Sequence, residues 1–100
     1  MKRIELHNKL VDILGSANVY FQPPASIKLK YPCIIYSLYN MDAEFGDNEP
    51  YTIEKRYEIT VITKDPDSNI PIKLAHMPKC IMNRAFTVDN LNHYVFLLYF

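Results

Sequence analysis

Apolar and polar positions at the start of the chain repeat with the period of an α-helix. In residues 1–14 the apolar side chains fall mostly three or four positions apart, while charged side chains take the other side. Gly15 follows directly and suits the end of a helix. We therefore expect an amphipathic helix that buries one side. That apolar side consists of Ile4, Leu6, Leu10, Val11, Ile13 and Leu14.

The middle of the chain is patterned for β-strands. Residues 18–21 predict a short extended piece, and residues 33–39 (CIIYSLY) are apolar at nearly every position, which is typical of a strand covered on both faces. Residues 51–63 (YTIEKRYEITVIT) alternate apolar and polar side chains, which predicts a strand with one solvated face. We expect residues 40–50 between them to form a projecting loop.

The last third of the chain predicts a helix and a hairpin. Asp67 or Ser68 can cap a helix, and Pro71 is tolerated in its first turn. The helix is expected over about 69–77 and should end at Pro78, because an interior proline removes a backbone hydrogen bond. The runs CIMNRAF and HYVFLLYF then predict strands around the turn signal DNLN.

These elements together predict an α+β fold, with a mainly antiparallel β-sheet of four to five strands packed against two α-helices. The length of 100 residues matches one domain, so residues 1–100 are expected to form a single unit. With 49% hydrophobic and 22% charged residues, the chain has the composition of a globular domain that can bury a core.

Charge and hydropathy exclude several classes of function. Eleven basic and eleven acidic side chains cancel, so no global positive field holds a phosphate backbone and a dedicated nucleic-acid binder is not expected. No run reaches the ~18 apolar residues of a membrane span. The N-terminus mixes charged and polar residues among its apolar ones, which does not match an export signal. We expect a soluble protein with no membrane partner.

Residues that carry chemistry are sparse and lack useful spacing. His76 and Cys80 are four positions apart, but Pro78 lies between them and no second pair has metal-ligand spacing. Cys33 and Cys80 lie in apolar segments, as free thiols usually do, which indicates a reducing compartment. Two glycines are too few for a phosphate-binding loop. We predict no catalytic residue, no metal site and no cofactor, and therefore no enzyme.

The predicted loop over residues 40–50 (NMDAEFGDNEP) concentrates negative charge in a neutral chain. A solvated loop is the simpler interpretation, because acidic loops are common. The functional interpretation is a surface that faces a lumen or a partner and repels phosphates, so that DNA slides past without specific binding. The acidic residues concerned are Asp42, Glu44, Asp47 and Glu49.

Two segments have more apolar side chain than a small monomer covers easily. Residues 20–36 carry aromatic and aliphatic side chains on a backbone that prolines restrain, so this backbone has little conformational entropy left to lose on docking. The final strand ends VFLLYF, apolar on both faces. A neighbouring subunit would cover this excess; packing on the chain's own domain is the alternative. The predicted interface residues, toward other copies or a tail, are Tyr20, Phe21, Pro23, Pro24, Ile27, Leu29, Tyr31, Phe96 and Phe100.

Four segments together resemble a family of small proteins from tailed bacteriophages, described as tail terminator, tail completion or minor tail proteins. They are NVYFQPPASIKLKYPCIIY, KRYEITVITKDPDS, IPIKLAHMPKC and TVDNLNHYVFLLYF, and the resemblance covers nearly all of the chain from Asn18 to Phe100. It implies a non-enzymatic ring, expected to be a homohexamer, that caps the tail tube, ends its polymerisation and joins it to the head. The implied partners are other copies, the tail tube protein, the head–tail connector protein and the DNA that passes through the lumen. The implied location is the head-proximal end of the tail in the virion, after assembly in the host cytoplasm.

Other functions stay open. A head-completion adaptor between portal and tail would use the same kind of surface. A small metal-dependent hydrolase that uses Asp65, Asp67 and His76 is the alternative from a different class, although no ligand spacing supports these three residues. An isolated peptide-binding module would stay monomeric at micromolar concentration.

Overall fold

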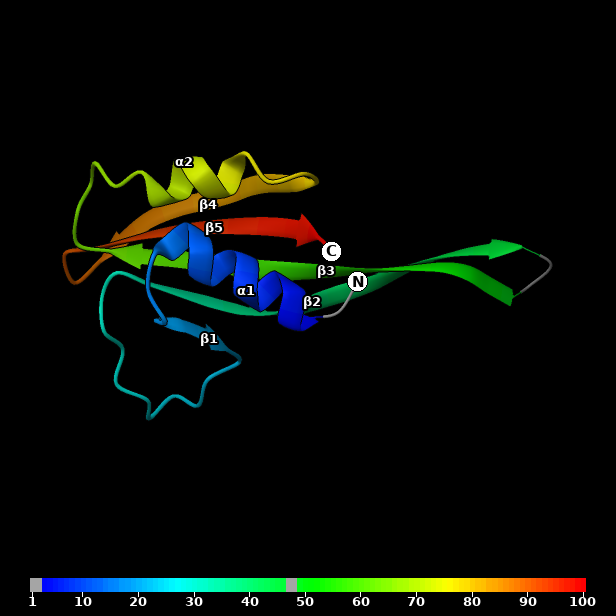
Figure 1. Ribbon diagram of the computed structural model, residues 1–100, viewed down its shortest axis with the longest axis horizontal. Coiled ribbons are helices and arrows are strands. Elements are labelled where there is room, and N and C mark those ends of the chain that lie inside the picture. The colour runs from blue at the N-terminus through cyan, green and yellow to red at the C-terminus, as the bar shows by residue number, and fades with distance from the viewer. Residues whose placement is uncertain (1–2, 47–48) are drawn as a thin grey trace.

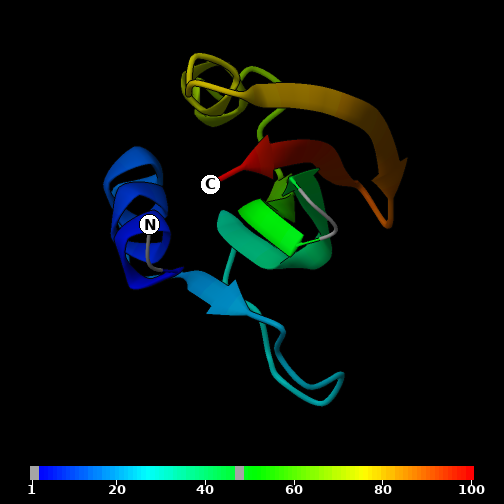
Figure 2. The ribbon, with the colours of Figure 1, turned by 90° about the vertical axis from the view of Figure 1, so that its right-hand side faces the viewer.

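The computed structural model describes residues 3–46 and 49–100, and the side chains of these residues except 42–46 and 49–53. A five-stranded sheet carries two helices on one face (Figures 1 and 2). The α+β fold with a mainly antiparallel sheet is therefore confirmed. In chain order the elements are α1 (Arg3–Leu14), β1 (Val19–Phe21), β2 (Cys33–Gly46), β3 (Glu49–Thr63), α2 (Ile70–Ala75), β4 (Cys80–Val88) and β5 (Leu91–Tyr99).

The strand order places β3 in the middle of the sheet. The order is β1-β2-β3-β5-β4, with β1 parallel to β2 and every other neighbouring pair antiparallel. The parallel pair needs a connection that returns along the sheet, and residues 22–32, hereafter the arm, provide it. The two edges of the sheet are thus the short strand β1, followed by the arm, and the longer strand β4.

The main core lies between the sheet and the helices. Leu6, Leu10 and Leu14 of α1 are buried at helical spacing, and Leu74 of α2 joins them. The sheet contributes alternate residues to the same cluster, namely Val19, Ile34, Tyr36, Tyr57, Ile59, Val61, Phe96 and Leu98. The expected apolar sides of the first helix and of β3 are therefore confirmed at most of their positions with described side chains, except for Ile4, which is exposed.

The predicted loop over residues 40–50 is wrong for most of its length. β2 continues to Gly46 and β3 begins at Glu49, and the strands stay paired as far as these two residues. The resulting hairpin projects from the body, as Figure 1 shows, and contributes to a longest extent of 51 Å. Ladder hydrogen bonds join backbone groups whatever the side chain, so polar residues extend a strand pair once its register is set.

The predicted acidic surface therefore lies on a hairpin rather than on a loop. Asp42 and Glu44 belong to β2 and Glu49 belongs to β3, with backbones paired to Glu54, Thr52 and Gly46 respectively. Asp47 lies outside the described residues, and so do the side chains of the other three acidic residues.

The second helix is shorter than the predicted range 69–77. Asn69 is its N-cap residue and makes no side-chain capping hydrogen bond, whereas the predicted capping residue Ser68 accepts a hydrogen bond through Oγ from the Ile70 N–H over 3.3 Å. The helix stops at Ala75, since Pro78 cannot continue it. The hairpin predicted for the C-terminal part is confirmed: β4 and β5 pair antiparallel. Neither α1 nor α2, within the part of the chain that the structure describes, is long and apolar enough to cross a bilayer.

Candidate functional site

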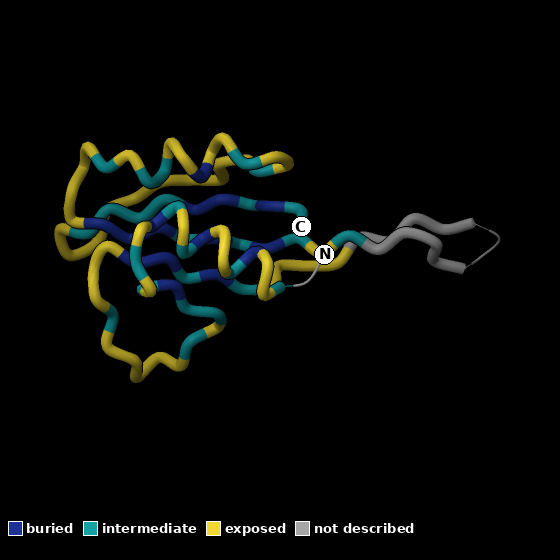
Figure 3. The backbone as a smooth tube through the Cα atoms, viewed as in Figure 1, coloured by how far each residue is buried: buried dark blue, intermediate teal, exposed yellow. Residues whose placement is uncertain are grey.

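The arm lies outside the sheet and is mostly exposed (Figure 3). It begins at Gln22, whose positive φ of 46° turns the chain away from β1. The Gln22 backbone N–H donates to the Tyr36 carbonyl over 2.9 Å, and its side-chain Oε1 accepts from the Leu38 N–H over 3.2 Å. Pro23 and Pro24 then restrict the backbone. The start of the arm is therefore firmly anchored on β2, while its later residues are not.

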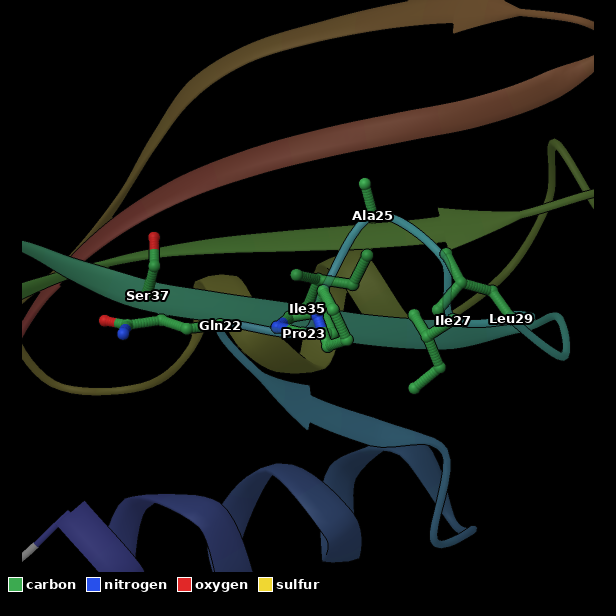
Figure 4. A pocket seen from close by; sticks show the side chains of 8 residues that line it. Gln22, Pro23, Ala25, Ile27, Leu29, Ile35 and Ser37 are labelled. Carbon is green, nitrogen blue, oxygen red and sulfur yellow. The ribbon is translucent and has the colours of Figure 1, made fainter.

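A pocket of about 470 Å³ lies between the arm and β2 (Figure 4). Ile27 and Leu29 of the arm and Ile35 of β2 contribute apolar walls, and Gln22 and Ser37 contribute the polar side chains. No lining side chain is charged, so the pocket suits an apolar side chain of another protein segment better than a charged ligand. The remaining lining residues are Pro23, Pro24 and Ala25.

The strand β4 forms a second exposed apolar surface at the opposite edge of the sheet. Ile81 is 69% exposed and Met82 is 46% exposed, and Phe86 and Val88 are exposed as well. Arg84, the only charged residue of this strand, lies 5.3 Å from the centre of the Phe86 ring. An edge strand offers unpaired backbone groups, so an apolar edge of this length favours association.

Sequence reasoning missed the β4 surface, since no residue of this strand is among the predicted interface residues. A signal was present, because the run CIMNRAFTV has apolar residues at both even and odd positions, hence on both faces of a strand, and only one charged residue. What the pattern could not indicate is that this strand lies at an edge of the sheet and that all of its residues after Cys80 are exposed.

The structure divides the predicted interface residues into three groups. Ile27, Tyr31 and Pro24 are exposed on the arm. Tyr20, Phe21, Pro23, Leu29 and Phe100 are half-buried. Phe96 is wrong as an interface residue, because it is 1% exposed and lies in the core under the helices.

Two of the half-buried aromatic rings pack within their own chain. The Phe21 ring lies 4.9 Å from the Tyr36 ring and carries the Arg3 guanidinium at 4.5 Å from its centre. The Lys9 ammonium lies 5.4 Å from the centre of the Phe100 ring. Packing on the chain's own domain, the alternative to a subunit contact, therefore applies to Phe21 and Phe100.

A polar cluster that sequence reasoning missed holds α1 on the sheet. The Tyr36 side chain is 0% exposed. Arg3 Nη1 donates a hydrogen bond to the Tyr36 hydroxyl over 3.0 Å, and His7 Nδ1 lies 2.7 Å from the same oxygen. Spacing of Arg3 and His7 by four residues on one helix face was the only available signal. Because Tyr36 is enclosed, this cluster is structural and offers no open site.

Neither the two thiols nor the three residues of the hydrolase alternative form a catalytic or metal-binding cluster in the part of the chain that the structure describes. Burial raises the pKa of Cys33 and of Cys80 to about 11, and both thiols are free. Asp65 and Asp67 precede α2 whereas His76 follows it, and Asp65 Oδ1 accepts a hydrogen bond from the Asp67 N–H over 2.9 Å. Among the described residues, no three His, Cys, Asp or Glu side chains are grouped so that they could hold a metal ion.

Comparison with protein-family models, with curated proteins and with solved structures finds no match. A proposal of function therefore rests on the surfaces described above and on the resemblance of the sequence segments.

Proposed function

We propose that this chain is a structural protein of a tailed bacteriophage, a tail terminator that forms a ring of identical copies. The ring, a hexamer in the expected case, caps the tail tube, ends its polymerisation and joins it to the head–tail connector. It acts by binding alone, without covalent chemistry or a cofactor. The resemblance of residues 18–100 to that phage family supports the assignment to a tail.

The observation that carries the ring is the exposed apolar surface at two separate places on one small domain. Ile27 and Tyr31 are exposed on the arm, and Ile81 and Met82 are exposed on the far edge of the sheet. Monomeric proteins rarely leave such patches uncovered. The arm and the β4 edge lie on opposite sides of the sheet, so one of them can join neighbouring copies while the other binds a different partner. Head-to-tail contacts between unlike surfaces close into rings when the rotation allows it.

The projecting hairpin supports the same proposal. It extends well beyond the body (Figure 1), and its sequence carries Asp42, Glu44, Asp47 and Glu49. In a ring, a projection of this length reaches either the lumen or a neighbouring subunit. Negative charge toward the lumen keeps DNA moving, because attraction to phosphates is what retards it.

The proposal is tested by measuring the mass of the protein in solution and by negative-stain imaging, alone and with purified tail tubes or connectors. We expect a ring that binds one end of the tube and stops further polymerisation. A head-completion adaptor would bind connectors and leave tubes uncapped. A protein that stays monomeric at about 100 μM, far above the micromolar range of weak specific contacts, and binds neither tubes nor connectors would refute the proposal.

Matched isoleucine variants separate assembly from folding. Ile81→Ser removes an exposed side chain from the β4 edge, whereas Ile4→Ser removes one that is 51% exposed on α1, away from the arm and from β4. Both variants should fold, because neither side chain belongs to the core. We expect only Ile81→Ser to weaken capping of the tube. Equal capping by both variants would exclude the β4 edge from the function.

A further inference from the structure

Part of the arm has the sequence pattern of a β-strand but no strand partner. Residues 27–31 read Ile, Lys, Leu, Lys, Tyr, so apolar and basic side chains alternate with period two. In the described part of the chain, residues 28–31 make no backbone hydrogen bond, and Lys28 and Lys30 are exposed without an ion pair. None of the five is a proline, so each retains its backbone N–H.

The outer edge of β2 is a matching strand edge without a partner. β1 pairs with β2 only as far as Tyr36, and the Gln22 side chain binds the N–H of Leu38. Beyond this point β2 continues to Gly46, and among the residues that the structure describes it pairs there only with β3, on its inner side. Leu38, Tyr39 and Met41 are exposed along the start of this free edge.

The two segments have complementary sequences. Residues 41–45 read Met, Asp, Ala, Glu, Phe, so apolar and acidic positions alternate where the arm alternates apolar and basic ones. Pairing 27–31 with 41–45 puts Lys28 and Lys30 in register with the acidic positions 42 and 44 whether the strands run parallel or antiparallel. Opposite charges directly across a strand pair are stabilising and like charges are destabilising.

The two segments cannot pair within one chain. The arm returns from Phe21 to Cys33, beside the start of β2, whereas residues 41–45 lie on the hairpin that points away from the body (Figure 1). Met41 alone is five residues beyond Tyr36, about 17 Å along the strand. The contact therefore has to join two copies.

We infer that residues 27–31 of one copy add as an extra strand to the free outer edge of β2, at residues 41–45, of a second copy. This inference rests on the proposed function and names the lateral contact of the ring. Strand addition supplies backbone hydrogen bonds for affinity, and alternate side chains supply specificity. Each copy has one arm and one free outer edge of β2, so the contact is head-to-tail and leaves the β4 edge available for a different partner.

The pocket beside the arm fits this contact. Ile27 and Leu29 line it, and strand addition brings the apolar positions 41, 43 and 45 of the second copy to the same face as these two residues. The contact would thus cover the pocket with apolar residues, which suit its apolar walls. In the same register, the acidic positions of the edge and the two lysines fall on the other face of the strand pair.

Charge reversal tests the pairing. An arm variant, Lys28→Glu with Lys30→Glu, and an edge variant, Asp42→Lys with Glu44→Lys, each place like charges across the contact. We expect each to weaken assembly at least about tenfold, because two attractive pairs become repulsive. The combined fourfold variant restores opposite charges and should regain the native assembly mass. Lys64→Glu with Lys73→Glu, two exposed lysines outside the arm, is the control with the same change of net charge as the arm variant.

Mass photometry across a concentration series gives the readout, with a thermal melt to verify that each variant folds. An equimolar mixture of arm and edge variants should also assemble when the ring has an even number of copies, because alternating subunits restore every pair. If native protein forms rings but the arm and edge variants assemble as the control does, or the fourfold variant does not recover, the pairing is wrong and the ring stands. If the native protein never assembles, both proposals fail.

Discussion

Replacing Tyr36 with phenylalanine tests whether one buried hydroxyl holds α1 against the sheet. The hydroxyl binds Arg3 Nη1 over 3.0 Å and His7 Nδ1 over 2.7 Å, and the substitution removes both interactions while it keeps the ring. A hydrogen bond to a charged group contributes about 1.5–3 kcal/mol and a neutral one about 1 kcal/mol. Arg3 is only half-buried and water can replace its lost partner, so we expect a loss of about 2 kcal/mol in the free energy of unfolding.

Urea unfolding followed by far-ultraviolet circular dichroism, at constant protein concentration, measures this loss. Tyr57→Phe is the matched control, because Tyr57 is also buried but makes no hydrogen bond through its side chain in the part of the chain that the structure describes. It should change stability by less than about 0.5 kcal/mol. A double-mutant cycle of Tyr36→Phe with His7→Ala should give a coupling of about 1 kcal/mol. If the two phenylalanine variants are equally stable, the hydroxyl does not hold the helix.

Three further predictions concern one thiol and two backbone positions. Burial raises the pKa of Cys33 to about 11 from 9.0, so the folded chain keeps a proton that the unfolded chain releases above pH 9. The contribution of this thiol to the free energy of unfolding is complete below pH 9 and falls by up to about 2–3 kcal/mol as the pH rises to about 11. Over this pH window the urea midpoint should therefore fall more steeply with pH for the native protein than for Cys33→Ala. Equal slopes of midpoint against pH would contradict the prediction. Gly15→Ala should lower the free energy of unfolding by about 1 kcal/mol, because a φ of +78° strains an alanine backbone. No steric clash adds to this loss, because the new Cβ meets nothing within 4 Å. Asn90→Gly, at φ 64° in the hairpin turn, should raise it by up to about 1 kcal/mol. Thermal melts that show the same sign for both variants would refute the backbone reasoning.

Where the physical signal is local, the sequence predicted the element. The spacing of Leu6, Leu10 and Leu14 indicates which side of α1 is buried, because helix geometry alone brings these residues onto one face. Alternation at Tyr57, Ile59 and Val61 does the same for β3. The hairpin turn at Asp89 and Asn90, both at positive φ, follows from residue types that tolerate this conformation.

The candidate surfaces were only partly predictable. The apolar arm could be identified because its prolines and its closely spaced apolar residues can be seen in the sequence. Phe96 was misassigned because alternation indicates that a strand has two faces but does not indicate which face the helices cover. The continuation of β2 through Asp42 and Glu44 was missed because ladder pairing with β3, not the preference of those residues, keeps them extended.

By itself, the sequence determined the helices, most of the strands, the C-terminal turn and the excess of apolar side chain. The tertiary structure alone decided that β4 lies exposed at an edge, that Tyr36 meets Arg3 and His7, and that the hairpin projects with a free outer edge. The physical reason is that periodicity and turn chemistry act over a few neighbouring residues. Strand order and helix placement depend instead on contacts between residues far apart in the chain, which no local pattern records.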